Sequence, residues 1–338
     1  MPDFNLKRLL LFGGNRKNED GPLLSLALNA VKFIDEVVIF TEDQHFNLPT
    51  QNGQSLRQKL EENKIKGLKW IITEKINLQL LKEYINENTM GLLINAVWIV
   101  KQDIIDSFEG KLFNYHNTRL PWERGAAQYS WKILSQSRDG ALTVHKVVTR
   151  IDAGDIVKQK KMIYPEECRV PADFYRYMEK YETTFLVDFL KGKELVCIQQ
   201  NEPESIYFPK LNTMLNGFIN WEWSAKEIEL FISAFDDPHE GASTFFQKRR
   251  LHLKKCFQTA EAKKFHSFQA GIIYRKTSGC LFVAARGGEL EIKEVFDNNG
   301  KDILSKMKIG QRFHTPYHFL DEAKTAKTLS PHTQLSKK

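Results

Sequence analysis

The sequence predicts an α/β protein with a doubly wound, Rossmann-like, mostly parallel sheet, followed by a small OB-like β-barrel. Two observations lead to this prediction. In the first half, short apolar runs without polar alternation take turns with segments of helical periodicity, as expected of strands buried on both faces. In the second half, short strand-like runs follow one another and are separated by turn-forming residues, which is typical of a small barrel.

The first predicted strand covers residues 7–14, ends in Gly13-Gly14 and leads into a polar loop at 15–21. The glycine pair lacks the full Gly-x-Gly-x-x-Gly pattern of dinucleotide sites, so a tight backbone turn that a ligand can approach is a sufficient explanation. Strands and helices then alternate: a helix at 22–33, a strand at 36–40, a helix at 55–63, a strand at 68–73, a helix at 78–86 and a strand at 90–97.

Polar side chains follow two further predicted strands. The strand at 111–116 ends with Asn114 and His116, which share one face because they are two residues apart. The strand at 142–148 leads into a loop that contains Asp152. Ligands bind at the carboxyl ends of strands in open α/β sheets. An Asn that donates to an oxyanion, a His that moves a proton and an Asp that orients it suit acyl transfer to an amine, although each motif alone is more often a surface turn.

The order of these motifs resembles the formyltransferases that use 10-formyltetrahydrofolate. Their signature is Asn-x-His, then a Leu-Pro-x-x-Arg-Gly loop, then a strand with a His, then Asp-x-Gly. The matching residues here are Asn114-Tyr115-His116, the loop 120–125, His145 and Asp152-Ala153-Gly154. The resemblance implies that Asn114, His116 and Asp152 are catalytic and that 10-formyltetrahydrofolate is the co-substrate, with no metal. His145 either contacts the site or is a core histidine.

The resemblance also implies a folate pocket with residues from three segments. They are Trp98, Ile99, Val100, Arg124, Val148, Thr149, Arg150 and Ile151. Trp98 could instead pack onto the sheet, and Arg124 could be a solvated loop arginine rather than an anion clamp. Ala126 stands where relatives carry a second arginine, so we expect none of the contacts of that arginine.

The remaining elements complete both units. We expect a helix at 128–137, a strand at 157–163, helices at 170–190 and 225–234, and strands at 242–246, 250–257, 271–274, 280–284 and 290–295. Ser224 and Glu227 form a predicted capping box. Residues 219–221, 234–238 and 310–313 resemble the C-terminal module of the methionyl-tRNA and sugar formyltransferases. We therefore expect a catalytic domain at 1–195, a linker at 196–217, a barrel at 218–320 and a polar tail at 321–338.

Composition leaves the partner open. The net charge of +7 is compatible with a nucleic acid, a phosphate-bearing substrate, the polyglutamate tail of a folate or solubility alone. The basic clusters at 248–250, 254–255 and 263–264 are more typical of a solvated face than of a nucleic-acid site. The four scattered cysteines indicate neither a disulfide framework nor zinc. Without a long apolar segment or a signal sequence, we expect a cytoplasmic protein; its oligomeric state is open, with a homodimer as one option.

Three acceptors of the formyl group are compatible with the resemblance. A nucleotide-linked amino sugar, which would belong to polysaccharide biosynthesis, is favoured because the segments 12–16 and 118–121 differ from the Phe-Ala-Gly-Thr-Pro and Ser-Leu-Leu-Pro segments of methionyl-tRNA formyltransferases. Methionyl-tRNA is the alternative, since the C-terminal module is retained. Water, as in a formyltetrahydrofolate hydrolase, and a non-catalytic nucleic-acid-binding relative are less favoured.

Overall fold

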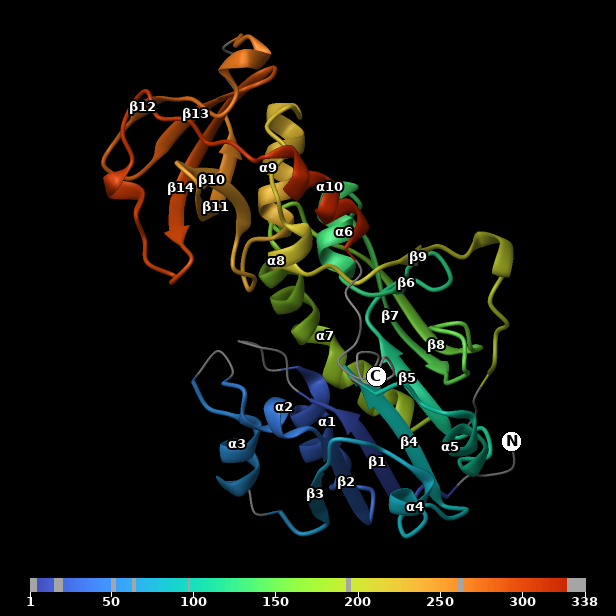
Figure 1. Ribbon diagram of the computed structural model, residues 1–338. Coiled ribbons are helices and arrows are strands. Elements are labelled where there is room, and N and C mark those ends of the chain that lie inside the picture. The colour runs from blue at the N-terminus through green and yellow to red at the C-terminus, as the bar shows by residue number, and fades with distance from the viewer. Residues whose placement is uncertain are drawn as a thin grey trace.

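The computed structural model describes residues 5–14, 21–49, 53–62, 65–96, 98–192, 196–259 and 264–326. The predicted polar loop at 15–20, Lys263 and the end of the predicted tail, 327–338, lie outside these ranges. Two sheets dominate the described part (Figure 1): a seven-stranded sheet in the lower half of the view and a five-stranded sheet at the upper left.

The seven-stranded sheet has the order β3-β2-β1-β4-β5-β7-β8. Five strands run parallel: β1 (Arg8–Gly13), β2 (Glu36–Thr41), β3 (Leu68–Ile72), β4 (Thr89–Ile94) and β5 (Leu112–His116). The last two, β7 (Asp139–Lys146) and β8 (Ile156–Ile163), are antiparallel to their neighbours. The predicted doubly wound, mostly parallel sheet is confirmed.

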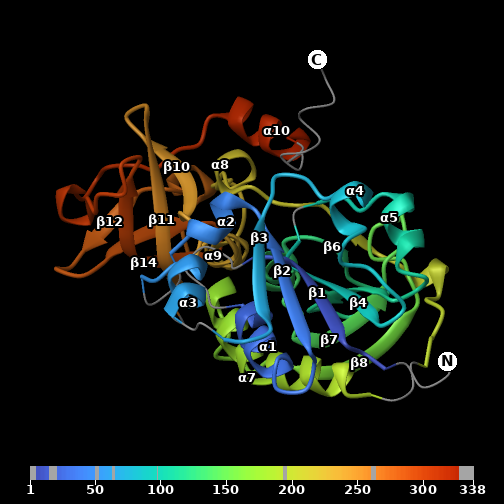
Figure 2. The ribbon, with the colours of Figure 1, turned by 90° about the horizontal axis from the view of Figure 1, so that it is seen from below.

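Two separate apolar clusters explain why the strands lack polar alternation. Leu9 and Leu11 of β1 belong to one cluster, whereas Leu10 and Phe12 belong to the other, so successive side chains are buried on opposite faces. Figure 2 shows the helices that cover these faces: α1 (Pro22–Ala30) and α7 (Pro171–Leu190) lie on one side, and α4 (Leu78–Leu81) and α5 (Gln102–Ser107) on the other.

Short helices account for most differences from the predicted elements. The helix expected at 78–86 already ends at Leu81, and α2 (Asp43–Asn47) and α5 were not expected. With 5 and 6 residues, α2 and α5 are too short to give a periodic pattern. In contrast, α3 (Leu56–Glu62) coincides with the predicted helix at 55–63 within the described residues.

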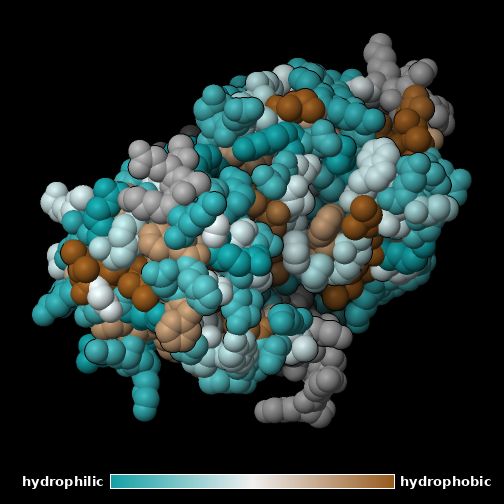
Figure 3. Space-filling model, turned by 90° about the horizontal axis from the view of Figure 1, so that it is seen from above, coloured by the Kyte–Doolittle hydropathy of each residue, from teal (hydrophilic) through white to brown (hydrophobic). Residues whose placement is uncertain are grey.

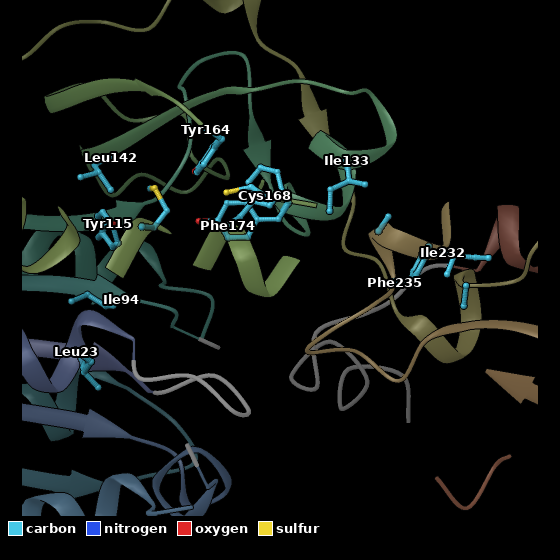
Figure 4. Packing of buried hydrophobic residues seen from close by; sticks show 14 of the residues in the cluster. Leu23, Ile94, Tyr115, Ile133, Leu142, Tyr164, Cys168, Phe174, Ile232 and Phe235 are labelled. Atoms are coloured by element: carbon cyan, nitrogen blue, oxygen red, sulfur yellow. The ribbon is translucent and has the colours of Figure 1, made fainter. Parts of the chain in front are cut away.

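The two sheets are joined through a pair of helices, α6 (Gln128–Leu134) and α9 (Ala225–Ala234). Ile133 of α6 lies toward Ile232 of α9 and Phe235, which directly follows α9, in Figure 4, and Ser130 Oγ donates to Ala234 O at 2.7 Å. Because α9 also packs on β11, one apolar core extends from the parallel sheet into the second unit.

The second unit is an antiparallel sheet that closes into a barrel. Its strand order is β10 (Ala242–Phe246), β11 (Arg249–Gln258), β14 (Gly288–Asp297), β13 (Leu281–Ala285) and β12 (Ile273–Lys276). The segment 310–314 bridges the two outer strands, since Ile273 N donates to Gln311 O and Phe245 N donates to His314 O. The predicted small barrel is therefore confirmed.

The region expected to be a linker contains short ordered elements. Its strand β9 (Tyr207–Phe208) pairs with β6 (Arg124–Gly125), and α8 (Thr213–Asn216) contacts α10 (Tyr317–Thr325) through a hydrogen bond from Asn216 Nδ2 to Ala323 O at 2.9 Å. The helix α10 extends into residues that were assigned to the polar tail. Single 3₁₀ turns occur at Glu202–Glu204, Ser267–Gln269 and Leu304–Lys306.

The surface and helix lengths add two facts about possible partners. On the face seen in Figure 3, hydrophobic residues form several separate patches within a mostly hydrophilic surface, rather than one large apolar area. None of the helices in the described ranges combines the length and apolar character that a membrane crossing requires.

Candidate active site

The three predicted catalytic residues line one cavity of about 380 Å³ at the carboxyl edge of the parallel sheet. Asn114 and His116 lie at the end of β5, and Asp152 lies on the loop between β7 and β8. Asn114 Nδ2 donates to Asp152 Oδ1 at 3.3 Å, and His116 Nε2 lies 3.9 Å from Asp152 Oδ2. The structure thus brings together side chains that are up to 38 positions apart in the chain.

The Asp152 carboxylate is held by donors on several sides. Its backbone has a left-handed φ of 50°, a conformation that Asp tolerates better than most residues. Gly125 N donates to Oδ2 at 2.8 Å. Burial alone would raise the pKa of Asp152, but the charge of His116, the hydrogen bond with His145 and the Gly125 N–H together hold it well below its usual value. Asp152 is therefore a permanent anion in this site and a poor proton acceptor.

His145 belongs to the site and not only to the core. It lies on β7 directly opposite Asn114 in the strand register. Its Nδ1 lies 2.8 Å from Lys146 O, so Nδ1 carries a proton, and Nε2 of the neutral ring accepts from Asn114 Nδ2 at 3.0 Å. Nε2 also lies 3.5 Å from Asp152 Oδ1. His145 therefore fixes the orientation of the Asn114 amide.

The orientation of His116 follows from a backbone contact. Nε2 donates to Glu123 O at 2.8 Å, and because a carbonyl only accepts, the proton of the neutral ring is on Nε2. Nδ1 then carries the lone pair. The loop that supplies this carbonyl is fixed by the buried Glu123 side chain, which is paired with Lys132, and Lys132 Nζ also donates to Asp139 O at 2.6 Å. No spacing pattern in the sequence pointed to this buried pair.

Arg124 does not reach the cavity. Its guanidinium makes a bidentate pair with Glu202, at 3.0 and 2.9 Å, and two further hydrogen bonds to Gln200 Oε1. Its side chain is only 7% exposed. Arg124 therefore holds the segment around β9 against the loop 120–125. It does not make the contact with a ligand that the sequence predicts. Gly125 follows with φ of 97°, and a Cβ there would lie 2.1 Å from Phe208 O, so the pairing of β6 with β9 requires glycine.

Gln200 is a residue of the site region that the sequence did not reveal. Its Nε2 donates to Asp152 O at 2.8 Å and to Gly154 O at 2.6 Å, while its Oε1 accepts from Arg124. It therefore ties the backbone of the Asp152 loop to the strand pair β6–β9. A segment without periodicity gave no signal for this contact.

The residues predicted to surround the folate divide into buried and exposed groups. Trp98 and Val100 are each 8% exposed and belong to the second apolar cluster, and Trp98 Nε1 donates to Glu74 O at 3.1 Å, so Trp98 packs as its alternative interpretation proposed. Ile99, Val148 and Ile151 are 65%, 42% and 60% exposed. They lie on loops that follow β4 and β7, on either side of β5, as do the exposed Thr149 and Arg150.

The glycine pair after β1 has a packing role. A Cβ at Gly13 would lie 1.8 Å from Ile94 O, and one at Gly14 would lie 2.6 Å from the His45 side chain. The close approach of chain segments, and not only of a ligand, therefore requires these glycines. Among the residues that the structure describes, no group of three or more His, Cys, Asp or Glu side chains is placed to hold a metal ion.

Comparison with known proteins agrees with this geometry. The family models described as "Formyl transferase" and "Formyl transferase, C-terminal domain" match residues 52–188 and 213–309. The methionyl-tRNA formyltransferase of Mycoplasma genitalium is 32% identical over 252 residues, which cover 70% of this chain and 74% of that protein. The chain belongs to the formyl transferase family. The match also covers the cavity that contains Asn114, His116 and Asp152.

Solved structures of similar fold include formyltransferases with different acceptors. An N-formyltransferase of Helicobacter canadensis, in complex with folinic acid and dTDP-3-aminofucose, gives a TM-score of 0.62 at 19% identity, over 85% of this chain and 99% of that one. The sugar 3N-formyl transferase WlaRD gives 0.63 at 18%, over 86% and 97%. The methionyl-tRNA formyltransferase of Clostridium thermocellum gives 0.52 at 18%, over 75% and 94%.

As a member of this family, the chain is a formyltransferase, and its formyl donor is 10-formyltetrahydrofolate. The site is compatible with this co-substrate. Exposed apolar side chains on the loops after β4 and β7 can lie against the flat faces of the folate rings, and they flank the strand that ends in Asn114 and His116.

Proposed function

We propose that this formyltransferase transfers the formyl group of 10-formyltetrahydrofolate to the primary amine of a nucleotide-linked amino sugar. The observation that supports formyl transfer best is that Asn114, His116 and Asp152 line one cavity, with His145 hydrogen-bonded to Asn114. For the acceptor, support comes from the similar structures that contain dTDP or dTDP-3-aminofucose and are matched over nearly their whole length.

Asn114 stabilises the oxyanion in this proposal. When the amine nitrogen bonds to the formyl carbon, the carbonyl π electrons move to the oxygen, which then needs a hydrogen-bond donor. The amide of Asn114 makes one shorter bond, at 3.0 Å to His145, and one longer bond, at 3.3 Å to Asp152. The formyl oxygen replaces the longer bond, while His145 keeps the amide oriented.

His116 accepts the proton that the attacking amine loses. Its Nε2 is engaged with Glu123 O, so its Nδ1 lone pair is the available base. The imidazolium that forms lies 3.9 Å from the anionic Asp152 and is stabilised by it. Asp152 itself is the weaker candidate base because its pKa is well below its usual value. The protonated His116 then returns the proton to N10 as the C–N bond to the folate breaks.

Methionyl-tRNA is the second candidate acceptor. The 32% identity to the Mycoplasma genitalium methionyl-tRNA formyltransferase favours it, and the net charge of +7 is compatible with it. The same catalytic residues would act on the α-amine of the methionyl group, so the chemistry alone does not separate the two acceptors.

A direct assay with parallel acceptors tests the proposal. The full chain is incubated with 10-formyltetrahydrofolate and, separately, with a panel of nucleotide-linked amino sugars and with methionyl-tRNA. We expect turnover with at least one amino sugar, lost in the Asn114→Ala enzyme. Turnover with methionyl-tRNA alone would replace the proposed acceptor and keep the proposed catalytic residues. No formyl transfer to any amine, despite folate binding, would contradict the proposed function.

A further inference from the structure

A second cavity, which we call the interdomain cavity, lies next to the catalytic one. It encloses about 770 Å³, within the range typical of sites for small molecules. Its walls come from α6, the segment that runs from β9 to the start of α9, α9 itself and α10, and its aromatic side chains are Trp131, Tyr207, Phe218, Trp223, Phe231 and Phe235. The helix α10 lies beyond residue 309, where the match to the C-terminal family model ends.

The walls of this cavity are aromatic and offer flat surfaces. Trp223 and Phe231 have ring centroids 5.0 Å apart, and Phe231 and Phe235 have centroids 4.9 Å apart, so three rings line one side. Two of its polar groups are already used: Trp131 Nε1 donates to Pro209 O at 3.0 Å, and the Asn216 amide donates to Ala323 O at 2.9 Å. Such a site favours a planar aromatic ring, held by stacking more than by hydrogen bonds.

The interdomain cavity adjoins the catalytic cavity. Three residues line both: Lys210, Leu211 and Phe235. Lys210 is exposed, and within the part of the chain that the structure describes it has no carboxylate partner. It lies close to α2, because its charge, after burial, contributes to lowering the pKa of His45. A free ammonium group therefore stands between the site of chemistry and the aromatic cavity.

We infer that the interdomain cavity binds the base of a nucleotide-linked acceptor and that Lys210 binds its diphosphate; this inference rests on the proposed function. In a nucleotide-linked amino sugar the groups follow the order amine, sugar, diphosphate, nucleoside. The molecule offers the same order: the Asn114–His116 cavity, then Lys210, then the aromatic cavity.

The order of groups distinguishes the two candidate acceptors. In methionyl-tRNA the methionyl ester and the terminal adenine are attached to the same ribose, and the phosphate lies on the other side of that ribose. The phosphate is therefore not between the amine and the base. A cation between the two cavities suits the nucleotide sugar, in which the diphosphate occupies that position.

Ligand binding to the full chain without folate tests the inference directly. Thymidine, uridine and guanosine diphosphates are titrated while the tryptophan fluorescence is followed, since Trp131 and Trp223 line the cavity. We expect Trp223→Ala to weaken binding of the nucleoside diphosphate by about 10- to 100-fold, the loss of one base–aromatic stack. We expect Lys210→Gln, a change at an exposed position, to weaken it by about tenfold.

Matched controls separate this effect from a general loss of stability. Trp70→Ala removes a partly buried tryptophan of β3, far from the cavity along the sheet, and Lys160→Gln removes an exposed lysine of β8. Both should bind nucleoside diphosphates like the wild type. Trp223→Leu serves as a second variant if Trp223→Ala does not fold. Unchanged binding in Trp223→Leu and Lys210→Gln would overturn the inference.

Steady-state kinetics separates failure of this inference from failure of the proposed function. With an active amino sugar, Trp223→Ala should raise the KM of the acceptor and leave the KM of the folate unchanged. If Trp223→Ala turns over the amino sugar with a normal acceptor KM, the inferred binding site is wrong and the proposed function stands. If nucleoside diphosphates bind in a way that depends on Trp223 but no amino sugar is formylated, the inferred binding site stands and the proposed function is wrong. Trp223-dependent turnover of methionyl-tRNA, without nucleoside diphosphate binding, would reject the inferred ligand.

Discussion

The catalytic cavity and the interdomain cavity are neighbours with opposite character. In the catalytic cavity Asn114, His116 and Asp152 each have a defined partner, and residues of β5, β7 and one loop hold one another. In the interdomain cavity the walls carry several aromatic side chains and come from elements far apart in the sequence, from α6 to α10. Under the proposed function and the inferred acceptor site, the chemistry depends on residues at strand ends, whereas recognition of the acceptor depends on packing between distant segments. Changes in the catalytic cavity should lower the rate with every acceptor. Changes in the interdomain cavity should affect only the KM of the acceptor.

The largest expected effect follows from Asp152→Asn. The substitution keeps the shape but places an amide against the donors Gly125 N and Asn114 Nδ2 and removes the anion beside His116. We expect the single-turnover rate of formyl transfer to fall about 1,000-fold or more, with any acceptor. The control Asp155→Asn, in the same loop, should keep the rate within about twofold. Near-normal transfer by Asp152→Asn would eliminate the proposed role of Asp152.

The depressed pKa of Asp152 gives this prediction a pH signature. A carboxylate whose folded pKa is lowered stabilises the folded state above its unfolded pKa, near 3.9, and this contribution is lost as the pH falls toward the folded pKa. The difference in unfolding free energy between the wild type and Asp152→Asn should be constant from pH 8 to about 5 and should shrink below about pH 4. Urea denaturation at several pH values measures it. A difference that stays constant below pH 4 would mean that the pKa of Asp152 is not depressed.

The second effect concerns Asn114. Because Asn114→Ala removes the proposed oxyanion donor, we expect kcat to fall by about 100- to 1,000-fold, while the KM of the folate changes little. The fall should be the same with an amino sugar as with any other acceptor that is turned over. If only the acceptor KM changes, Asn114 acts in acceptor binding and not in the chemical step. The catalytic and interdomain cavities would then differ less in function.

The same contrast explains how much the sequence could reveal. The two-residue spacing of Asn114 and His116 and the turn at Asp152 are local patterns, and the sheet that unites them follows from the alternation of strands and helices. The sequence left two interpretations of His145, a site residue or a core residue, because its partner Asn114 lies on the neighbouring strand. Contacts such as Gln200 with the Asp152 loop join segments 48 positions apart and have no local pattern. The contacts that form the interdomain cavity have no local pattern either. A buried Phe in a helix gives the same sequence pattern whether it lines a cavity or packs in the core.

A moderate effect is expected where the two regions meet. Gln200→Ala removes the hydrogen bonds to the carbonyls of Asp152 and Gly154 and one support of Arg124. Loss of a residue that only positions a catalytic group should lower kcat by about 10-fold, with little change in either KM. The matched control is Gln159→Ala, whose amide donates to Leu120 O and Thr143 Oγ1 away from the Asp152 loop. Equal effects of the two variants would assign Gln200 to general stability.

The smallest effect is expected at the start of the helix that carries the aromatic wall. Ser224 caps α9: its Oγ accepts from Glu227 N, and the Glu227 carboxylate accepts from Ser224 N at 2.8 Å, as the predicted capping box required. Ser224→Ala should cost about 1 kcal/mol of unfolding free energy. Since Phe231 and Phe235 lie about two and three turns further along, where tertiary packing holds the chain, acceptor KM and kcat should stay within about twofold. If the acceptor KM rises as far as in Trp223→Ala, the positions of Phe231 and Phe235 depend on the capped end of α9 and not on the packed core. The catalytic and interdomain cavities would then differ less than their lining residues indicate.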